Sequence, residues 1–246
     1  MTRSPETVLV ADLTGTSRHN AGLVSRFEPP VLRWFAARMP ARVTPDHLTV
    51  VGCAGAVIYC LAYAASAGDR GWLWLASLGL VINWFGDSLD GTLARYRHIE
   101  RPRYGFLLDN GVDVIQQVLL ALGFALSGLI RSDLCFLALA AFFAMSILTL
   151  LRARVFGEFH LTYLGIGPTE LRLIFIALNA AMVWFPPQPF TIAGWPLTYP
   201  DLLSLAWSCA MLAAFVVLLT QDATRLSALE PPRAPAGESH NDNSGG

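Results

Sequence analysis

The chain reads Asp87-Ser-Leu-Asp90-Gly91-Thr-Leu-Ala94-Arg95 and, after a short basic stretch, Gly105-Phe-Leu-Leu-Asp109-Asn-Gly-Val-Asp113, all within an otherwise apolar region. An ionised carboxylate at membrane depth costs several kcal/mol unless it is paired or coordinated. Residues three or four apart share one face of a helix, so Asp87 lies beside Asp90, and Asp109 beside Asp113. Two such helices would together form an all-oxygen site for a hard cation such as Mg²⁺ or Mn²⁺. The pattern therefore predicts a metal site of the kind that handles phosphates.

The composition around this pattern indicates a membrane protein. Of 246 residues, 54% are hydrophobic and only 14% are charged, whereas about 25% are charged in soluble domains. Six windows are long and apolar enough to cross the ~30 Å hydrocarbon core, which takes about 20 helical residues. Because they lack the period-2 alternation of barrel strands, the sequence predicts an all-α polytopic protein with six transmembrane helices. The windows are 48–67, 72–93, 106–130, 134–156, 168–186 and 201–221.

The arginines predict the orientation of these helices. All 17 basic side chains are arginine, and fifteen of them fall before, after or between the expected helices on one side of the membrane. The opposite loops hold only Arg70 and Arg131. By the positive-inside rule, both termini and the aspartate pattern are cytoplasmic. We therefore expect a multi-pass protein of a bacterial inner membrane.

The six windows divide the chain into three regions. Residues 1–47 form a cytoplasmic N-terminal segment, in which 29–39 predicts an amphipathic helix with Leu32, Phe35, Ala36 and Met39 on one face. This face lies in the lipid headgroup layer, packs on the protein, or does both. Residues 48–221 form the catalytic domain, and 222–246, rich in small and polar residues, is expected to be a disordered cytoplasmic tail. The four cysteines fall singly in apolar windows, so we expect no metal or redox role for them.

The aspartate pattern resembles the signature of the CDP-alcohol phosphatidyltransferase family, D-x-x-D-G-x-x-A-R followed by G-x-x-x-D-x-x-x-D. Every fixed letter is present. The resemblance implies a metal-dependent phosphotransferase of phospholipid synthesis that moves a substituted phosphate group from a CDP-alcohol to an acceptor alcohol and releases CMP. It also implies two bound Mg²⁺ or Mn²⁺ ions and a homodimer in the lipid bilayer, and we expect no nucleic-acid partner.

The resemblance also assigns roles to individual residues. Asp87, Asp90, Asp109 and Asp113 are the expected metal ligands, and Asp113 is also the expected general base for the acceptor hydroxyl. The expected CDP-alcohol contacts are Thr49, Gly91, Ala94, Arg95 and Gly105. Small residues leave room for a cytidine, although they are also common where membrane helices pack. Arg95 suits a phosphate, or it serves as a positive-inside anchor.

The acceptor alcohol is harder to place from the sequence. Arg152, Arg154, Glu170 and Arg172 lie near the expected cytoplasmic helix ends and are candidate acceptor contacts. The stretch Gly167-Pro-Thr-Glu170 is also good helix-start chemistry, so capping explains it equally well. It has a weak resemblance to the branch of the family that uses CDP-choline or CDP-ethanolamine rather than CDP-diacylglycerol. Arg97, Arg101 and Arg103 are interpreted as a solvated face near headgroups.

Two other functions compete with this interpretation. A UbiA-type prenyltransferase also holds Mg²⁺-diphosphate on aspartate-rich helices, but its first motif needs N-D-x-x-D-x-x-x-D. Here Asn83 is not followed by aspartate, and Ala94 stands four residues after Asp90. A divalent-cation transporter would explain carboxylates in the membrane, but the sequence shows no acidic path at mid-depth and no inverted repeat.

Overall fold

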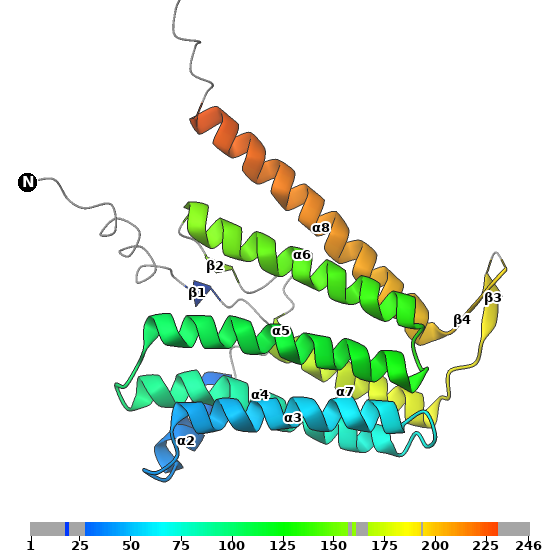
Figure 1. Ribbon diagram of the computed structural model, residues 1–246, viewed down its shortest axis with the longest axis horizontal. Coiled ribbons are helices and arrows are strands. Elements are labelled where there is room, and N and C mark those ends of the chain that lie inside the picture. Colours follow the sequence, from blue (N-terminus) through cyan, green and yellow to red (C-terminus); the bar gives the residue numbers. More distant parts are fainter. Residues whose placement is uncertain (1–17, 20–27, 157–158, 161–166, 193, 231–246) are drawn as a thin grey trace, which may run out of the picture.

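The protein is described here by a computed structural model that covers residues 18–19, 28–156, 159–160, 167–192 and 194–230. Within these residues it is a bundle of long helices preceded by one short helix (Figure 1). The helices are α2 (Glu28–Arg38), α3 (Pro45–Ala65), α4 (Trp72–Tyr96), α5 (Pro102–Ser127), α6 (Ser132–Phe156), α7 (Pro168–Trp184) and α8 (Tyr199–Leu229). Two short sheets accompany them: β1 (Arg18–His19) pairs in parallel with β2 (Phe159–His160), and β3 (Phe190–Ile192) pairs antiparallel with β4 (Trp195–Leu197).

Each of the six expected windows falls on one of the helices α3 to α8, which confirms the all-α class. By length and composition, four helices in the described part of the chain can cross a membrane: α3, α5, α6 and α8. Helix α7 has only 17 residues, and α4 carries Asp87 and Asp90 in its last three turns. The count of six spans therefore stays a prediction.

Helices α3 and α4 meet along a seam of glycines. A Cβ atom on Gly86 of α4 would lie 2.3 Å from the backbone nitrogen of Gly52 on α3, and one on Gly55 would lie 2.5 Å from the backbone nitrogen of Asn83. Helix backbones come this close only where no side chain intervenes. The seam therefore fixes the height and rotation of α4, and with them the positions of Asp87 and Asp90, relative to α3.

Helix α3 also packs against α5, so it contacts both of the helices that carry the aspartates. It begins at Thr44, whose hydroxyl accepts a hydrogen bond from the backbone nitrogen of His47 at 3.3 Å, while Nδ1 of His47 accepts from the Thr44 nitrogen at 3.2 Å. This reciprocal cap fixes the first turn of α3, in which Asp46 lies. Helix α5 begins with Pro102, which suits a first helical position, and ends before Gly128, whose positive φ of 68° favours glycine.

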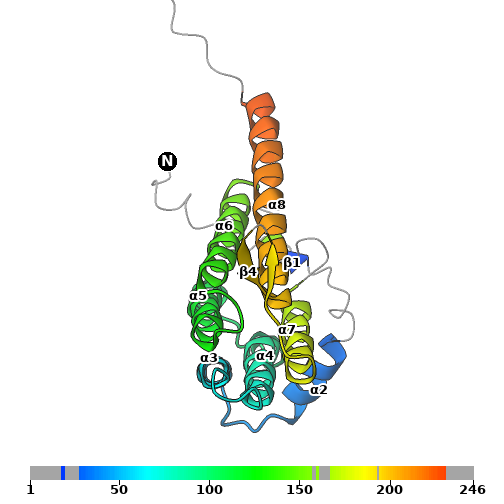
Figure 2. The same cartoon turned by 90° about the vertical axis from the view of Figure 1, so that its right-hand side faces the viewer.

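Helices α6 and α8 form a pair that inclines away from the other helices (Figures 1 and 2). The pair is joined by an ion pair, in which Nε of Arg152 on α6 lies 2.9 Å from Oδ2 of Asp222 on α8. Helix α8 continues to Leu229, past residue 221, where we expected the helix to end and a disordered tail to begin. The ion pair with Arg152 holds Asp222, the first residue of the expected tail, against α6. Most of the expected tail, residues 231–246, lies outside the described residues, as do residues 1–17 and 20–27.

The short helix α2 packs on α3 and α4 through the face that the sequence predicts. Leu32 and Ala36 are buried with Leu48 of α3 and with Leu89 and Leu93 of α4, and Phe35 and Met39 pack beside them. Of the two interpretations of this face, packing on the protein is confirmed. The opposite face exposes Val31 and Trp34, and the guanidinium of Arg38 lies 4.0 Å above the Trp34 ring. Contact of that outer face with lipid headgroups stays a prediction.

Candidate active site

Two cavities lie beside the aspartates of α4 and α5. The outer cavity has a volume of about 370 Å³ and is lined by α3, α4, α5 and the loop between α4 and α5. It brings together Asp90 and Asp109 with all five residues that were predicted to contact the CDP-alcohol: Thr49, Gly91, Ala94, Arg95 and Gly105. These residues lie up to sixty positions apart in the chain, and they converge because α3 packs against both α4 and α5.

Asp90 is the most enclosed of the four aspartates, with a relative exposure of 7%. Its Oδ2 accepts a hydrogen bond from the hydroxyl of Thr49 at 2.7 Å, and its Oδ1 accepts from the backbone nitrogen of Gly91 at 2.5 Å. The two bonds fix the direction of the carboxylate. Thr49 therefore lines the outer cavity and at the same time orients Asp90.

The glycines of the outer cavity have open space where a side chain would be. A Cβ atom on Gly91 would meet only the tip of the Arg95 side chain, at 3.2 Å, and one on Gly105 would meet nothing within 4 Å. Neither glycine lies against another helix backbone. Helix packing therefore does not account for Gly91 or Gly105, and the space beside them is available to a ligand.

Arginines surround the mouth of the outer cavity in different ways. Nη2 of Arg95 lies 3.2 Å from the Thr92 hydroxyl, which holds its guanidinium beside Gly91. Arg101 donates a hydrogen bond to Asp46, and this bond raises the pKa of Arg101 above its usual value, so the guanidinium remains charged. Arg97 lies elsewhere: it donates to the carbonyl oxygens of Met39, Pro40 and Val43. Its function is to fasten the α2–α3 connection rather than to form part of a solvated face.

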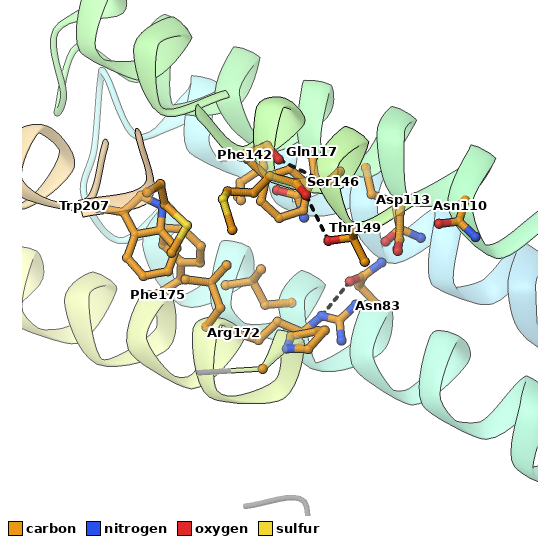
Figure 3. A pocket seen from close by; sticks show the side chains of 18 of the residues that line it. Asn83, Asn110, Asp113, Gln117, Phe142, Ser146, Thr149, Arg172, Phe175 and Trp207 are labelled. Carbon is orange, nitrogen blue, oxygen red and sulfur yellow. Dashed lines mark hydrogen bonds between the residues drawn. The ribbon is translucent and has the colours of Figure 1, made fainter. Parts of the chain in front are cut away.

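The inner cavity has a volume of about 160 Å³ and extends from the aspartates toward α6 and α8. Figure 3 shows its two ends, with the polar side chains of Asn83, Asn110, Asp113 and Arg172 at one and the rings of Phe175 and Trp207 at the other. Asp113 comes from α5 and Arg172 from α7. The cavity therefore combines a charged end with an apolar end.

Arg172 reaches from α7 to the first aspartate of the pattern. Its Nη2 donates to Oδ2 of Asp87 at 2.7 Å, and its Nε donates to Oδ1 of Asn83 at 3.0 Å. Asn83 is 3% exposed, and its amide nitrogen donates to the carbonyl oxygen of Gly52 at 3.0 Å. Asn83 was not among the residues that we expected at the site. The available signal was a polar residue one helical turn before Asp87 in an apolar span, on the same helix face.

The four aspartates are divided between these surroundings. Asp90 and Asp109 line the outer cavity, Asp113 lines the inner cavity, and Asp87 is bound by Arg172. No group of three or more His, Cys, Asp or Glu side chains converges as a metal site within the residues that the structure describes. The carboxylates are nevertheless close enough for Asp113 to interact electrostatically with each of the other three. Their oxygen donors fit a hard divalent cation.

Of the predicted acceptor residues, Arg172 lines the inner cavity, whereas Glu170, Arg152 and Arg154 line neither cavity. Glu170 caps α7, because its Oε2 accepts a hydrogen bond from the Gly167 nitrogen at 3.0 Å. Arg152 pairs with Asp222, and Arg154 is exposed in the last turn of α6. Capping therefore explains the Gly167-to-Glu170 stretch.

Comparison with known proteins identifies the class of protein that this fold and site define. Residues 42–200 match the CDP-alcohol phosphatidyltransferase family, and this span runs from the connection before α3 to the start of α8, with all four aspartates inside it. The chain belongs to the CDP-alcohol phosphatidyltransferase family. It is therefore a membrane transferase of phospholipid synthesis, as the aspartate signature predicted.

Two relatives whose names state a product match part of the chain. The chain is 31% identical over 134 residues to an archaetidylinositol phosphate synthase of Pyrococcus horikoshii, an alignment that covers 54% of this chain and 67% of that protein. It is 36% identical over 92 residues to a phosphatidylinositol phosphate synthase of Cutibacterium acnes, which covers 37% of this chain and 41% of that protein. Both relatives are named for products that carry an inositol phosphate.

Proposed function

We propose that this protein transfers the phosphate-linked lipid group of a CDP-linked lipid alcohol to an inositol phosphate and releases CMP. The observation that carries the proposal is the position of the aspartates between two cavities of different character. The names of the two relatives support an inositol phosphate as the acceptor. The alternative acceptor class is diacylglycerol with CDP-choline or CDP-ethanolamine, and neither relative is named for such a product.

The cytidine diphosphate part of the donor fits the outer cavity. Gly91 and Gly105 leave room there for a flat base or a sugar, and Arg95 can present a forked pair of donors to a phosphate. The charged Arg101 lies at the same mouth and favours an anion. The inner cavity, with Arg172 and Asp113 at its polar end, fits the anionic acceptor.

The aspartates would hold the metal ions of this reaction. Asp87, Asp90, Asp109 and Asp113 supply oxygen donors only, and we propose that they bind two Mg²⁺ or Mn²⁺ ions. When bound, the ions would neutralise the diphosphate, so that an incoming hydroxyl can approach the phosphorus.

In the chemical step, the acceptor hydroxyl oxygen forms a bond to the phosphorus nearest the lipid, and the bond from that phosphorus to the CMP oxygen breaks. CMP leaves with the electron pair, and the hydroxyl proton passes to the Asp113 carboxylate. Asp113 suits this role because it faces the inner cavity, one helical turn from Asp109 in the outer cavity. The bias of the arginines supports a cytoplasmic site in a bacterial inner membrane, and the homodimer stays a prediction.

A substrate panel on the purified protein tests the proposal. CMP release would be measured with a CDP-linked diacylglycerol and, in turn, inositol phosphate, inositol, serine and glycerol phosphate, and also with CDP-choline and diacylglycerol. We expect CMP and a new phospholipid with inositol phosphate only, and no turnover in excess chelator. Turnover with another acceptor but not with inositol phosphate would overturn the assigned headgroup, and full turnover in chelator would overturn the metal site.

The role of Asp113 is tested by the same assay together with nucleotide binding. Asp113→Asn should lose at least ~100-fold in turnover, in line with general-base catalysis, while keeping much of its affinity for the CDP-alcohol. Asp90→Asn should lose that affinity, because it removes a proposed ligand of the metal ions that would neutralise the diphosphate in the outer cavity. Asp133→Asn, in the first turn of α6 at the opposite end of the bundle, is the matched control and should behave as wild type. Equal losses of nucleotide affinity in Asp113→Asn and Asp90→Asn would refute the assignment of Asp113 as the base.

A further inference from the structure

Asp87 already contacts a cation of the protein itself. Nη2 of Arg172 lies 2.7 Å from its Oδ2, and the two side chains are only 14% and 25% exposed. A divalent ion at the same carboxylate would lie within a few ångströms of the guanidinium, where like charges repel strongly at low dielectric. Guanidinium and metal ion are therefore competitors for Asp87.

We infer that Arg172 is an exchangeable counter-ion of Asp87, and that a metal ion displaces its guanidinium from this carboxylate toward the inner cavity. The inference rests on the metal site of the proposed function and adds the order of events within it. Arg172 neutralises one of four neighbouring carboxylates when no metal ion does so, and it becomes available to an anionic acceptor when a metal ion takes its place.

The hydrogen bonds of Arg172 suit such an exchange. Its guanidinium is held at two points: Nε donates to Asn83 and Nη2 donates to Asp87. The Asn83 bond does not depend on Asp87, because Asn83 is buried and anchored on the Gly52 carbonyl oxygen of the α3–α4 seam. Loss of Asp87 as a partner therefore frees one arm of the guanidinium and leaves the other arm in place.

The Nη2 group that is freed from Asp87 can bind a ligand in the inner cavity. Arg172 and Asp113 both line the inner cavity, at the polar end shown in Figure 3. A guanidinium presented there suits a phosphate group, with which it forms short, charge-assisted hydrogen bonds. Metal binding therefore prepares the inner cavity for an anionic acceptor, and the acceptor phosphate binds after the metal ion.

The direction of a change in metal affinity tests the exchange without any turnover. Mn²⁺ would be titrated by electron paramagnetic resonance into chelator-treated wild-type protein and Arg172→Gln, with no substrate present. Because the variant has no guanidinium to displace, we expect it to bind Mn²⁺ about ten-fold more tightly, the effect of one charged hydrogen bond. Its melting temperature should be lower than that of wild type in chelator and should rise further when Mn²⁺ is added.

A matched control is available in the Arg152–Asp222 pair, which is buried to a similar degree, with side chains 21% and 13% exposed. Arg152→Gln should melt earlier with and without Mn²⁺ and should leave the Mn²⁺ affinity unchanged. Equal or weaker Mn²⁺ binding by Arg172→Gln would show that Arg172 holds Asp87 in place for the metal, and would overturn the exchange. Failure of the wild type to bind Mn²⁺ would instead remove the metal site of the proposed function.

A second measurement uses the wild-type protein and so does not depend on the stability of a variant. Modification of Arg172 by phenylglyoxal, read by peptide mass spectrometry, should increase several-fold when Mn²⁺ is added to chelator-treated protein. Inositol phosphate should then protect Arg172 in the presence of Mn²⁺ but not in chelator. An unchanged or lower reactivity with Mn²⁺, or equal protection in chelator, would contradict the release of Arg172.

Discussion

The α3–α4 seam and the outer cavity both depend on glycines, yet the glycines have opposite surroundings. At the seam, a Cβ atom on Gly86 or Gly55 would lie 2.3 or 2.5 Å from a backbone atom of the neighbouring helix. Beside the cavity, a Cβ atom on Gly91 meets only the end of a flexible arginine, and one on Gly105 meets nothing within 4 Å. The first set holds two helices together, whereas the second set keeps space open.

Helix α4 therefore carries both kinds of glycine, for packing and for ligand space, within two turns. Gly86 directly precedes Asp87, and Gly91 directly follows Asp90, so packing and ligand space flank the same pair of aspartates. Close backbone contact fixes the carboxylates on one side, and the missing side chains admit a ligand on the other. Spacing in the sequence does not separate the two kinds of glycine, because only the neighbouring helix decides between them.

Gly86→Leu should produce the largest effect. Its side chain would have to enter the backbone of α3 near Gly52, so the two helices must separate, and we expect a cost above about 4 kcal/mol. The measurement is the yield of monodisperse protein in detergent, which should fall to background. Gly111→Ala, whose new Cβ meets nothing within 4 Å, is the control and should give normal yield. A well-folded Gly86→Leu protein would show that the seam is not as close as described.

Gly91→Leu should abolish turnover while the protein still folds. The added side chain enters the outer cavity, where it displaces only the tip of Arg95, and leucine has a better helix propensity than glycine by up to about 1 kcal/mol. Thermal unfolding in detergent, with and without CDP-alcohol, is the measurement. We expect the wild-type melting temperature without the nucleotide and no increase when it is added. Early melting would instead place Gly91 with the packing glycines of the seam.

Tyr59→Phe should have the smallest effect and tests the link between the seam helix and the cavities. The Tyr59 hydroxyl of α3 donates to the Gln116 carbonyl oxygen of α5 at 2.6 Å in a buried position, and loss of such a bond costs about 1 kcal/mol. The melting temperature should fall by a few degrees. Tyr199→Phe, which loses an exposed bond to the Phe185 carbonyl oxygen, is the matched control and should melt within a degree of wild type. A Tyr59→Phe protein as stable as wild type would mean that α3 holds α5 by apolar packing alone.

The helices followed from the sequence because their signals are local. Apolar windows predicted the positions of α3 to α8, and a 3.6-residue period predicted the buried face of α2. The five expected nucleotide contacts came from the resemblance to the family. They line one cavity because α3 packs against both α4 and α5.

The remaining site contacts depend on partners that are distant in the chain. Arg152, an expected acceptor contact, pairs with Asp222 of α8, and the spacing of the arginines does not reveal this partner. The cap that Glu170 forms with the Gly167 nitrogen is local, and the sequence offered it as one of two explanations. Arg172 finds Asp87 and Asn83 across 85 and 89 residues. The end of α8 was missed because the apolar window ends before Asp222, whereas the helix continues to Leu229 and its Asp222 pairs with Arg152 of α6.

The seam between α3 and α4 has a consequence for genetics. An inherited substitution at Gly86 or Gly55 would place a Cβ atom 2.3 or 2.5 Å from a backbone nitrogen of the other helix. It would abolish the synthesis of the lipid, although neither residue lines the inner or the outer cavity. A screen for loss of that lipid would therefore return both glycines together with the aspartates. Only the amount of protein in the membrane would separate the two groups of alleles, because the aspartate alleles leave a full complement of inactive enzyme and the glycine alleles leave none.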